Sequence, residues 1–418
     1  MNNYSMHHQT AKSYNFLSAN THVIYFFISS IIFFISCGEK PQAEHYGFLT
    51  LLGNDTIAVE NVTRQENTLT SDEVDRFPLV RVRHTVIQLN PDNSIKHLVM
   101  NIHTPSEPEN QRECKVIADV TNDSVHLSKT DGRGTLHRDF ATGGAIVVAH
   151  VPQMYSLYEL YFAAALKHAT SANSNNSLPI RQFYIDREFD RFPLGRALVK
   201  PLDSGKAEVT HDWLSGTGEA TMDSNYHMLR YTGVRTTYKV EVSRLTSPPD
   251  IKNIADRFEA IETKAGTVKQ LSVRDSVHAQ IGDAVFLVDY SRPLMRGRTL
   301  LGDVVPYDHV WRTGANAATQ FITSAAIKLA GMQVPAGMYT LWTLPHRNEV
   351  DLIVNKQTGQ WGTGYNGAYN LGTAKFTTET PGTHVEEFTI SIVPQDAKHG
   401  TLVMEWGNFK WVAPIEVQ

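Results

Sequence analysis

The most chemically distinctive stretch of the sequence is residues 290–316, YSRPLMRGRTLLGDVVPYDHVWRTGAN, which holds four arginines. The planar fork of a guanidinium group matches a carboxylate or a phosphate, so clustered arginines are typical of anion sites. If this segment is extended, Arg296 and Arg298 point to the same side of a strand. Gly297 between them would let a backbone or a ligand approach closely. The pattern therefore predicts a site for a polar or anionic ligand.

A structural role explains the same arginines equally simply. Three acidic residues lie in or next to the segment, namely Asp289, Asp303 and Asp308. Ion pairs with them would hold loops against a sheet and would leave about one positive charge over. Arg312 is followed by Asn316, a further hydrogen-bonding side chain, and is preceded by Trp311, which offers an apolar wall. Both readings remain open at the level of sequence.

A second stretch with chemical potential is residues 357–370, QTGQWGTGYNGAYN. Trp361 and Tyr365 stand among glycines and asparagines there, and aromatic side chains on such loops often stack against sugars or peptides. The alternative is a connection whose aromatic residues pack onto the edge of a sheet. Binding is favoured if this loop lies near Arg312.

Catalytic motifs are absent from the sequence. It contains neither a GxSxG nucleophile elbow nor an HExxH metal motif. His309, Asp308 and Glu405 could meet in the fold and serve a hydrolase, but their spacing does not require it. We therefore assign no catalytic residue and no cofactor.

Histidines are numerous, and three of them belong to one predicted hairpin. A tight register would place His84, His97 and His103 on one face, where three imidazoles could hold zinc. Surface or core histidines with ordinary hydrogen bonds explain the pattern more simply, so we predict no metal site.

The N-terminal region predicts export. Residues 22–36, HVIYFFISSIIFFIS, form an apolar run that suits the core of a signal peptide. The run ends in FISC, which resembles a bacterial lipobox and implies cleavage before Cys37 and acylation of its thiol. We expect a signal peptide at 1–36 and a lipidated tether at 37–44. An ordinary signal peptide or a single anchor is the alternative.

Composition sets broad limits on the function. The chain has 418 residues, of which 41% are hydrophobic and 19% charged, and this length predicts two folded domains. A net charge of −5 gives no indication of nucleic-acid binding. The only cysteines are Cys37 and Cys114, so a lipidated Cys37 would leave Cys114 without a disulfide partner.

Short alternating runs of apolar residues predict a mainly β protein. Residues 45–245 should form a curved antiparallel sheet or open barrel with one helix at 154–172. Residues 246–269 should form a helical linker. Residues 270–418 should form an antiparallel β-sandwich, because apolar residues alternate along its last strands.

Three stretches of the C-terminal region resemble the domain-of-unknown-function family 2911. They read DYSRPLMRGRTLLGDVVPYDHVWRTGANAATQFITS, VPAGMYTLWTLP and GTLVMEWGNFKWVAPIEV. The resemblance covers residues 279–417 and implies a β fold in an exported protein, chiefly of Bacteroidetes and their relatives. It implies no activity.

Together these features favour a protein of the cell envelope that is anchored to a membrane by lipid. Its preferred function is non-catalytic binding of a polar or anionic small ligand or of an envelope partner. The expected ligand contacts are Arg296, Arg298, Trp311, Arg312, Asn316, Trp361 and Tyr365. A hydrolase is the first alternative, and a lipid or lipoprotein carrier built on the first domain is the second.

Overall fold

The computed structural model describes residues 42–77, 79–172, 176–185, 194–265 and 271–418. The predicted signal peptide, the lipidation site Cys37 and most of the tether lie outside these residues. No helix among the described residues is both long and apolar enough to span a bilayer. Residues 41–418 form one compact unit that contains two large sheets. The mainly β architecture is therefore confirmed.

The first sheet has fifteen strands, in the order β8-β7-β6-β5-β4-β3-β2-β1-β15-β14-β13-β12-β11-β10-β9. Its first eight strands are β1 (Glu44–Leu52), β2 (Asp55–Gln65), β3 (Thr68–Asp75), β4 (Arg81–Leu89), β5 (Ile95–His103), β6 (Glu113–Val120), β7 (Ser124–Asp131) and β8 (Gly134–Ala141). The other seven are β9 (Val147–His150), β10 (Leu178–Tyr184), β11 (Gly195–Pro201), β12 (Lys206–His211), β13 (Gly218–Met222), β14 (Met228–Thr232) and β15 (Glu241–Leu245). Neighbouring strands are antiparallel except β9 and β10, which are parallel.

Strands β4 and β5 form the hairpin predicted around His84, His97 and His103. Val86 lies opposite Val99, and the inward side chains of β4 alternate with outward ones. This period of two is what a sheet with one buried face requires. A short helix, α1 (Glu109–Arg112), then leads into β6.

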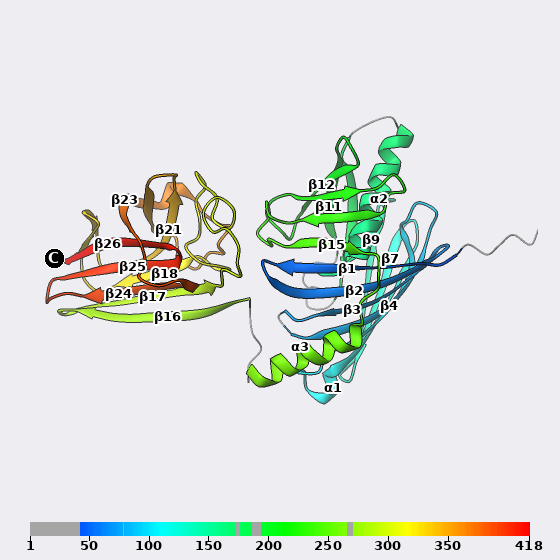
Figure 1. Cartoon of the computed structure of the whole chain (residues 1–418), viewed down its shortest axis with the longest axis horizontal. Helices are drawn as coiled ribbons and strands as arrows, with labels where there is room; N and C mark the ends of the chain where they lie inside the picture. Colours follow the sequence, from blue (N-terminus) through cyan, green and yellow to red (C-terminus); the bar gives the residue numbers. More distant parts are fainter. Residues whose placement is uncertain (1–41, 78, 173–175, 186–193, 266–270) are drawn as a thin grey trace, which may run out of the picture. The chain divides into compact units, whose positions relative to one another are not determined.

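Helix α2 (Tyr155–Ala172) confirms the helix predicted at 154–172 and packs against β2, β9, β10 and β11. All of its first eleven side chains are buried. Figure 1 shows the helix beside β9 and β11. A helix that is buried around its whole circumference must lie inside a core rather than on a surface. The concave face of the first sheet is therefore occupied by this helix.

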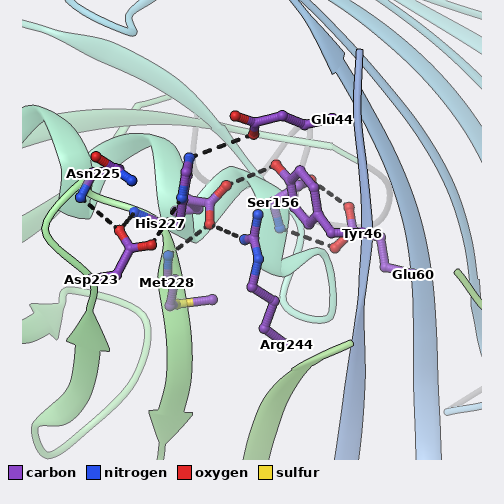
Figure 2. Close-up of polar contacts among 10 residues, drawn as sticks. Glu44, Tyr46, Glu60, Ser156, Asp223, Asn225, His227, Met228 and Arg244 are labelled. Atoms are coloured by element: carbon purple, nitrogen blue, oxygen red, sulfur yellow. Dashed lines mark hydrogen bonds and ion pairs between the residues drawn. The ribbon is translucent and has the colours of Figure 1, made fainter. Parts of the chain in front are cut away.

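The buried carboxylate of Glu159 attaches α2 to three strands. It accepts hydrogen bonds from the hydroxyl of Tyr46 at 2.7 Å and from the backbone N–H of Met228 at 2.7 Å. The guanidinium of Arg244 donates to it at 2.6 Å and lies over the ring of Tyr46 (Figure 2). These partners come from β1, β14 and β15, so one side chain joins the helix to the middle of the sheet.

A second buried carboxylate, that of Glu60 on β2, holds the start of α2. It accepts from the backbone N–H of Ser156 at 3.0 Å, from the Ser156 hydroxyl, and from the Ser71 hydroxyl at 2.6 Å. Burial nevertheless raises the pKa of Glu60.

Helix α3 (Ile251–Ala265) follows β15 and packs on β2 and β3 through Ala255 and Phe258. It lies within the predicted helical linker. Its apolar residues recur at helical spacing, which is why the sequence identified it.

The second sheet has eleven antiparallel strands and curls into a nearly closed, barrel-like form. They are β16 (Ser272–Ile281), β17 (Ala284–Pro293), β18 (Thr319–Thr323), β19 (Ile327–Leu329), β20 (Met332–Val334), β21 (Gly337–Pro345), β22 (Val350–Asn355), β23 (Asn370–Glu379), β24 (Val385–Pro394), β25 (His399–Gly407) and β26 (Phe409–Val417). The alternating apolar residues of β24, β25 and β26 point into its core, as predicted.

We predict that Glu159→Ala destabilises the fold by about 3–5 kcal/mol, because it leaves the buried charge of Arg244 without its partner. Chemical denaturation of the variant and of the parent measures this loss. The matched control is Asp256→Ala, which removes an exposed ion pair with Lys252 on α3 and should cost under about 1 kcal/mol. Equal stability of the Glu159 variant and the parent would contradict the account of this network.

Candidate anion-binding site

A cavity of about 510 Å³ lies beside the arginine segment. The end of β17, the β17–β18 loop, the β22–β23 loop and residues 235–239 of the first sheet all contribute to it. The cavity is lined by all of the predicted ligand contacts except Trp361, namely Arg296, Arg298, Trp311, Arg312, Asn316 and Tyr365.

The charge on the cavity wall has one sign. Arg235, Lys239, Arg296, Arg298 and Arg312 line it, and the described lining residues include no aspartate or glutamate. Burial, together with the neighbouring Arg296, lowers the pKa of Arg298 to about 10. Burial, followed by repulsion from Arg298 and Arg312, also lowers the pKa of Lys239. The cavity thus collects positive charge that its own wall does not neutralise.

Two arginines of the segment are structural. Arg292 forms ion pairs with Asp275 and Glu387, both at 3.0 Å, and its guanidinium also contacts the backbone of β24. It therefore closes the second sheet between β17 and β24. The guanidinium of Arg296 pairs with Asp55 at 3.0 Å and donates to the backbone oxygen of Leu271. These two residues thus have structural ion pairs, but not with the expected Asp289, Asp303 or Asp308; Asp289 pairs with Arg274 instead.

The extended conformation expected for Arg296 and Arg298 is wrong. Strand β17 ends at Pro293, and Arg296 and Gly297 both adopt positive φ, 53° and 68°. The N–H of Arg298 closes this turn by donating to the backbone oxygen of Met295 at 3.1 Å, and the backbone oxygen of Arg296 accepts from the N–H of Asn54 at 2.9 Å. Because the segment is not extended, the alternation of side chains along a strand does not predict where Arg296 and Arg298 point.

Arg298 is held in place without being neutralised. Its guanidinium donates to the backbone oxygens of Met295 at 2.9 Å and Leu294 at 2.6 Å. No carboxylate contacts it among the described residues. Lys239 is in a similar position, since its ammonium donates to the backbone oxygen of Val234 at 2.6 Å. Carbonyl groups orient these cations but leave their charge in the cavity.

Arg312 is the least satisfied cation of the site. Its Nε is buried and has no hydrogen-bond partner among the described residues, and burial lowers its pKa. Gly362 lies directly against its side chain, since a Cβ at that position would fall 2.0 Å from the Arg312 Cδ. The N–H of Gly362 donates to the backbone oxygen of Asn316 at 2.9 Å. The loop 357–370 therefore lies next to Arg312, the condition that favours binding.

Aromatic side chains form the rest of the wall. Trp311 belongs to the core of the second sheet, where it stacks on Trp406 with ring centroids 5.9 Å apart. Tyr365 packs against Trp342 at 5.0 Å. Trp361 is 59% exposed and lies outside the cavity lining, so the structure separates it from the other predicted contacts.

Among the charged and tryptophan residues of the lining, sequence reasoning missed Arg235, Lys239, Trp342 and Trp406. The two aromatic residues stand in ordinary strand patterns that predict a core position and nothing more. Arg235 and Lys239 lie far from the arginine segment in sequence, and no local pattern connects them to it.

The residues named for a hydrolase do not assemble. His309 Nδ1 contacts the backbone oxygen of Tyr307 at 2.8 Å, and the carboxylate of Asp308 contacts His346 instead. Glu405 pairs through its backbone with Lys410 on the neighbouring strand. The proposed acid and base therefore have different partners in the fold.

The hairpin histidines do share one face, as the register predicted. Each contacts a different carboxylate, in the pairs His84 with Asp72, His97 with Asp119 and His103 with Glu113. A tighter grouping of possible metal ligands is His346, Glu349 and Asp351. The ammonium of Lys375 already pairs with both of those carboxylates, at 2.5 and 2.7 Å, and so occupies the place of a cation.

The interior of the first sheet bears on the carrier alternative. Helix α2 fills its concave face, and the charged side chains of Glu60, Glu73, Asp75, Arg83 and Glu159 are buried there. A carrier of apolar cargo needs an open apolar cavity instead. Cys114 is half-buried and packs against this core, in agreement with a structural role.

Comparison with known proteins identifies only the second sheet. Residues 272–415 match the family model described as "Protein of unknown function (DUF2911)". This match confirms the resemblance found in the C-terminal third of the sequence. Among curated proteins, none is similar in sequence to this chain.

Two solved structures share a distant likeness with the chain. One is a DUF1089 family protein from Pseudomonas aeruginosa, with 13% identity and a TM-score of 0.33, covering 44% of this chain and 93% of that one. The other is a β-barrel-like protein of domain of unknown function DUF1849 from Brucella abortus, with 12% identity and a TM-score of 0.31, covering 49% and 94%. Likenesses at this level carry no functional conclusion.

We predict that Gly362→Ala lowers stability by about 1–3 kcal/mol, because the new methyl group would overlap both the Arg312 Cδ and the backbone oxygen of Asn316. Chemical denaturation gives the difference. Gly382→Ala is the matched control, since a Cβ there meets no atom within 4 Å. A Gly362 variant as stable as its control would show that the loop does not press on Arg312.

Proposed function

We propose that this protein binds a small anionic ligand, through a carboxylate or phosphate group, in the cavity beside Arg312, and that it does so without catalysis. The observation that carries the proposal is the charge on the lining, which has five cationic side chains and no carboxylate among the described residues. Arg235 and Arg296 pair with carboxylates outside the lining, Glu208 at 2.7 Å and Asp55 at 3.0 Å, which leaves three cations without an ion pair in the described part of the chain. An unpaired buried charge costs several kcal/mol, which an incoming anion would recover.

The difference between arginines that form ion pairs and arginines that do not supports this proposal. Arg292 and Arg296 are already paired with carboxylates, so their charge is used within the fold. Arg298 and Lys239 contact only carbonyl oxygens, and the Nε of Arg312 has no partner among the described residues. These three cations are the ones available to an anion.

The walls of the cavity suit a ligand with an apolar body. Trp311, Trp342, Trp406 and Tyr365 all line it. Aromatic surface with a few convergent charged groups is the usual composition of a small-molecule site. Low local polarity also strengthens each charge-assisted hydrogen bond to the anion.

We expect Arg312→Ala to weaken anion binding by about 10- to 100-fold, the worth of a lost hydrogen bond to a charged group. Isothermal titration of the full-length chain against a panel of phosphates and carboxylates, aromatic carboxylates among them, measures the affinity. Arg274→Ala is the matched control, because Arg274 forms an ion pair with Asp289 and does not line the cavity. The proposal fails if no member of the panel binds, or if both variants bind as the parent does.

We further propose that the protein is held in the cell envelope by lipid on Cys37. The support is the FISC motif directly after an apolar run in the sequence. Cys37→Ser should then release the protein from the membrane fraction, and radiolabelled fatty acid should mark the parent only. Incorporation of label into the Cys37→Ser variant would refute acylation at this residue.

A further inference from the structure

A second feature of the first sheet, remote in sequence from the arginine segment, is a chamber of buried polar groups without partners. It is formed by His150 at the end of β9, Gln182 on β10, His211 at the end of β12, Trp213, and Tyr161 of α2. Six polar atoms of these residues are buried and have no hydrogen-bond partner among the described residues. They are both ring nitrogens of His150, His211 Nε2, Gln182 Nε2, Trp213 Nε1 and the Tyr161 hydroxyl.

Such a concentration is unusual for a folded protein. Buried polar groups are almost always paired, and each one left unpaired costs about 1–3 kcal/mol. Several on one spot imply that something absent from the polypeptide itself, a water or a bound ligand, completes the chamber. The surrounding rings lie close together, since Trp213 is 4.7 Å and Tyr184 is 5.4 Å from His150 between centroids.

The tautomer of His211 indicates what kind of ligand would complete this group of unpaired atoms. Its Nδ1 lies 3.2 Å from the Gln182 Oε1, an atom that can only accept, so Nδ1 carries the proton and donates. The Nε2 of His211 is therefore left with a free lone pair, buried and without a partner. An imidazole whose one nitrogen donates to an oxygen while the other offers a lone pair is the arrangement of a metal-binding histidine.

The spacing of the two imidazoles fits a shared ion. Metal–nitrogen distances of about 2.0–2.1 Å allow two imidazoles on one ion to have ring centroids up to about 6.4 Å apart. The centroids of His150 and His211 are 5.6 Å apart. His150 has both nitrogens unpaired, so either can turn its lone pair toward that ion.

The remaining groups of the chamber would support a cation. The Gln182 amide, the Trp213 indole N–H and the Tyr161 hydroxyl are donors that would hold water or hydroxide ligands of the ion. The faces of Tyr158 and Trp213, which lie 5.9 and 4.7 Å from His150, attract positive charge. Neutral imidazole is a ligand that divalent copper and zinc favour.

We propose that His150 and His211 bind one divalent transition-metal ion, of the copper and zinc type, inside the first sheet. The site is separate from the cationic cavity, whose lining contains neither histidine. Metal binding there is a function of the first sheet that does not depend on the proposed anion site. A negative result for the metal would therefore not argue against anion binding.

The pH dependence separates this site from adventitious surface binding. Burial lowers the pKa of His211 to about 3 and, with repulsion from His211, lowers the pKa of His150 well below the ordinary imidazole range. Burial thus disfavours the protonated form of both rings, so they keep their lone pairs to lower pH than an exposed imidazole does. An exposed imidazole with an ordinary pKa of about 6.5 is mostly protonated there and loses its metal.

The experiment is a titration of the full-length, chelator-treated chain with Cu²⁺ at pH 5.0, followed by tryptophan fluorescence and by metal analysis after dialysis. We expect one retained equivalent of copper and quenching of Trp213. Trp213→Phe, which removes one of the groups that surround the ion, should lose that part of the quenching. His211→Phe should weaken binding by at least about tenfold. His278→Phe, at an exposed position of β16, should behave as the parent does.

Three results would each overturn the proposal. The first is no retained equivalent at pH 5.0, which would mean that the chamber holds water only. The second is quenching that is the same in Trp213→Phe as in the parent, which would place the copper elsewhere. The third is undiminished binding by a His211→Phe variant whose near-ultraviolet circular dichroism matches that of the parent. If His211→Phe does not fold, the Trp213→Phe comparison alone decides the question.

Discussion

The desolvation of charged side chains is the constraint on which this structure depends. An ion removed from water needs a partner of opposite charge or several hydrogen bonds, or its burial costs several kcal/mol. Within the first sheet this need is met, because Glu159 receives Arg244, Tyr46 and a backbone N–H. At the closure of the second sheet it is met again by Arg292 with Glu387. Around Arg312 it is not met within the described residues.

This difference separates structural from functional charge. Ion pairs neutralise the charges of Arg292 and Arg296. These pairs close the second sheet and fix the turn at Arg296. The cations that contact only carbonyl oxygens or have no partner among the described residues keep their charge, and they share one cavity with five aromatic residues. The neutral chamber around His150 is the uncharged counterpart of that cavity, since its groups also lack partners within the described chain. In both places, groups that the fold leaves unsatisfied mark the candidate sites.

The sequence predicted the elements well where a repeating pattern covers a whole element. The alternation along β24 to β26 placed Phe388 and Trp406 in the core, and the 154–172 helix was located closely because its apolar residues are dense. It did not predict the turn at Arg296, because a positive φ at a residue other than glycine is uncommon and no residue type announces it there. The turn is closed by the N–H of Arg298 on the oxygen of Met295, and its Arg296 oxygen accepts from Asn54, more than two hundred residues away. The same limit explains why Lys239 was missed. The chamber of His150 and His211 was missed too, since no spacing rule joins histidines on two strands that are not adjacent in the chain.

The central claim is that a bound anion accepts a hydrogen bond from the Nε–H of Arg312. The most direct measurement is an arginine Nε ¹H–¹⁵N correlation spectrum of the full-length chain, recorded during a titration with inorganic phosphate. The account predicts a saturable downfield shift of the Arg312 Nε proton and little change at Arg296, whose Nε already donates to Asp55. An Arg312 signal that does not move, or that moves no more than the signals of exposed arginines, would contradict it.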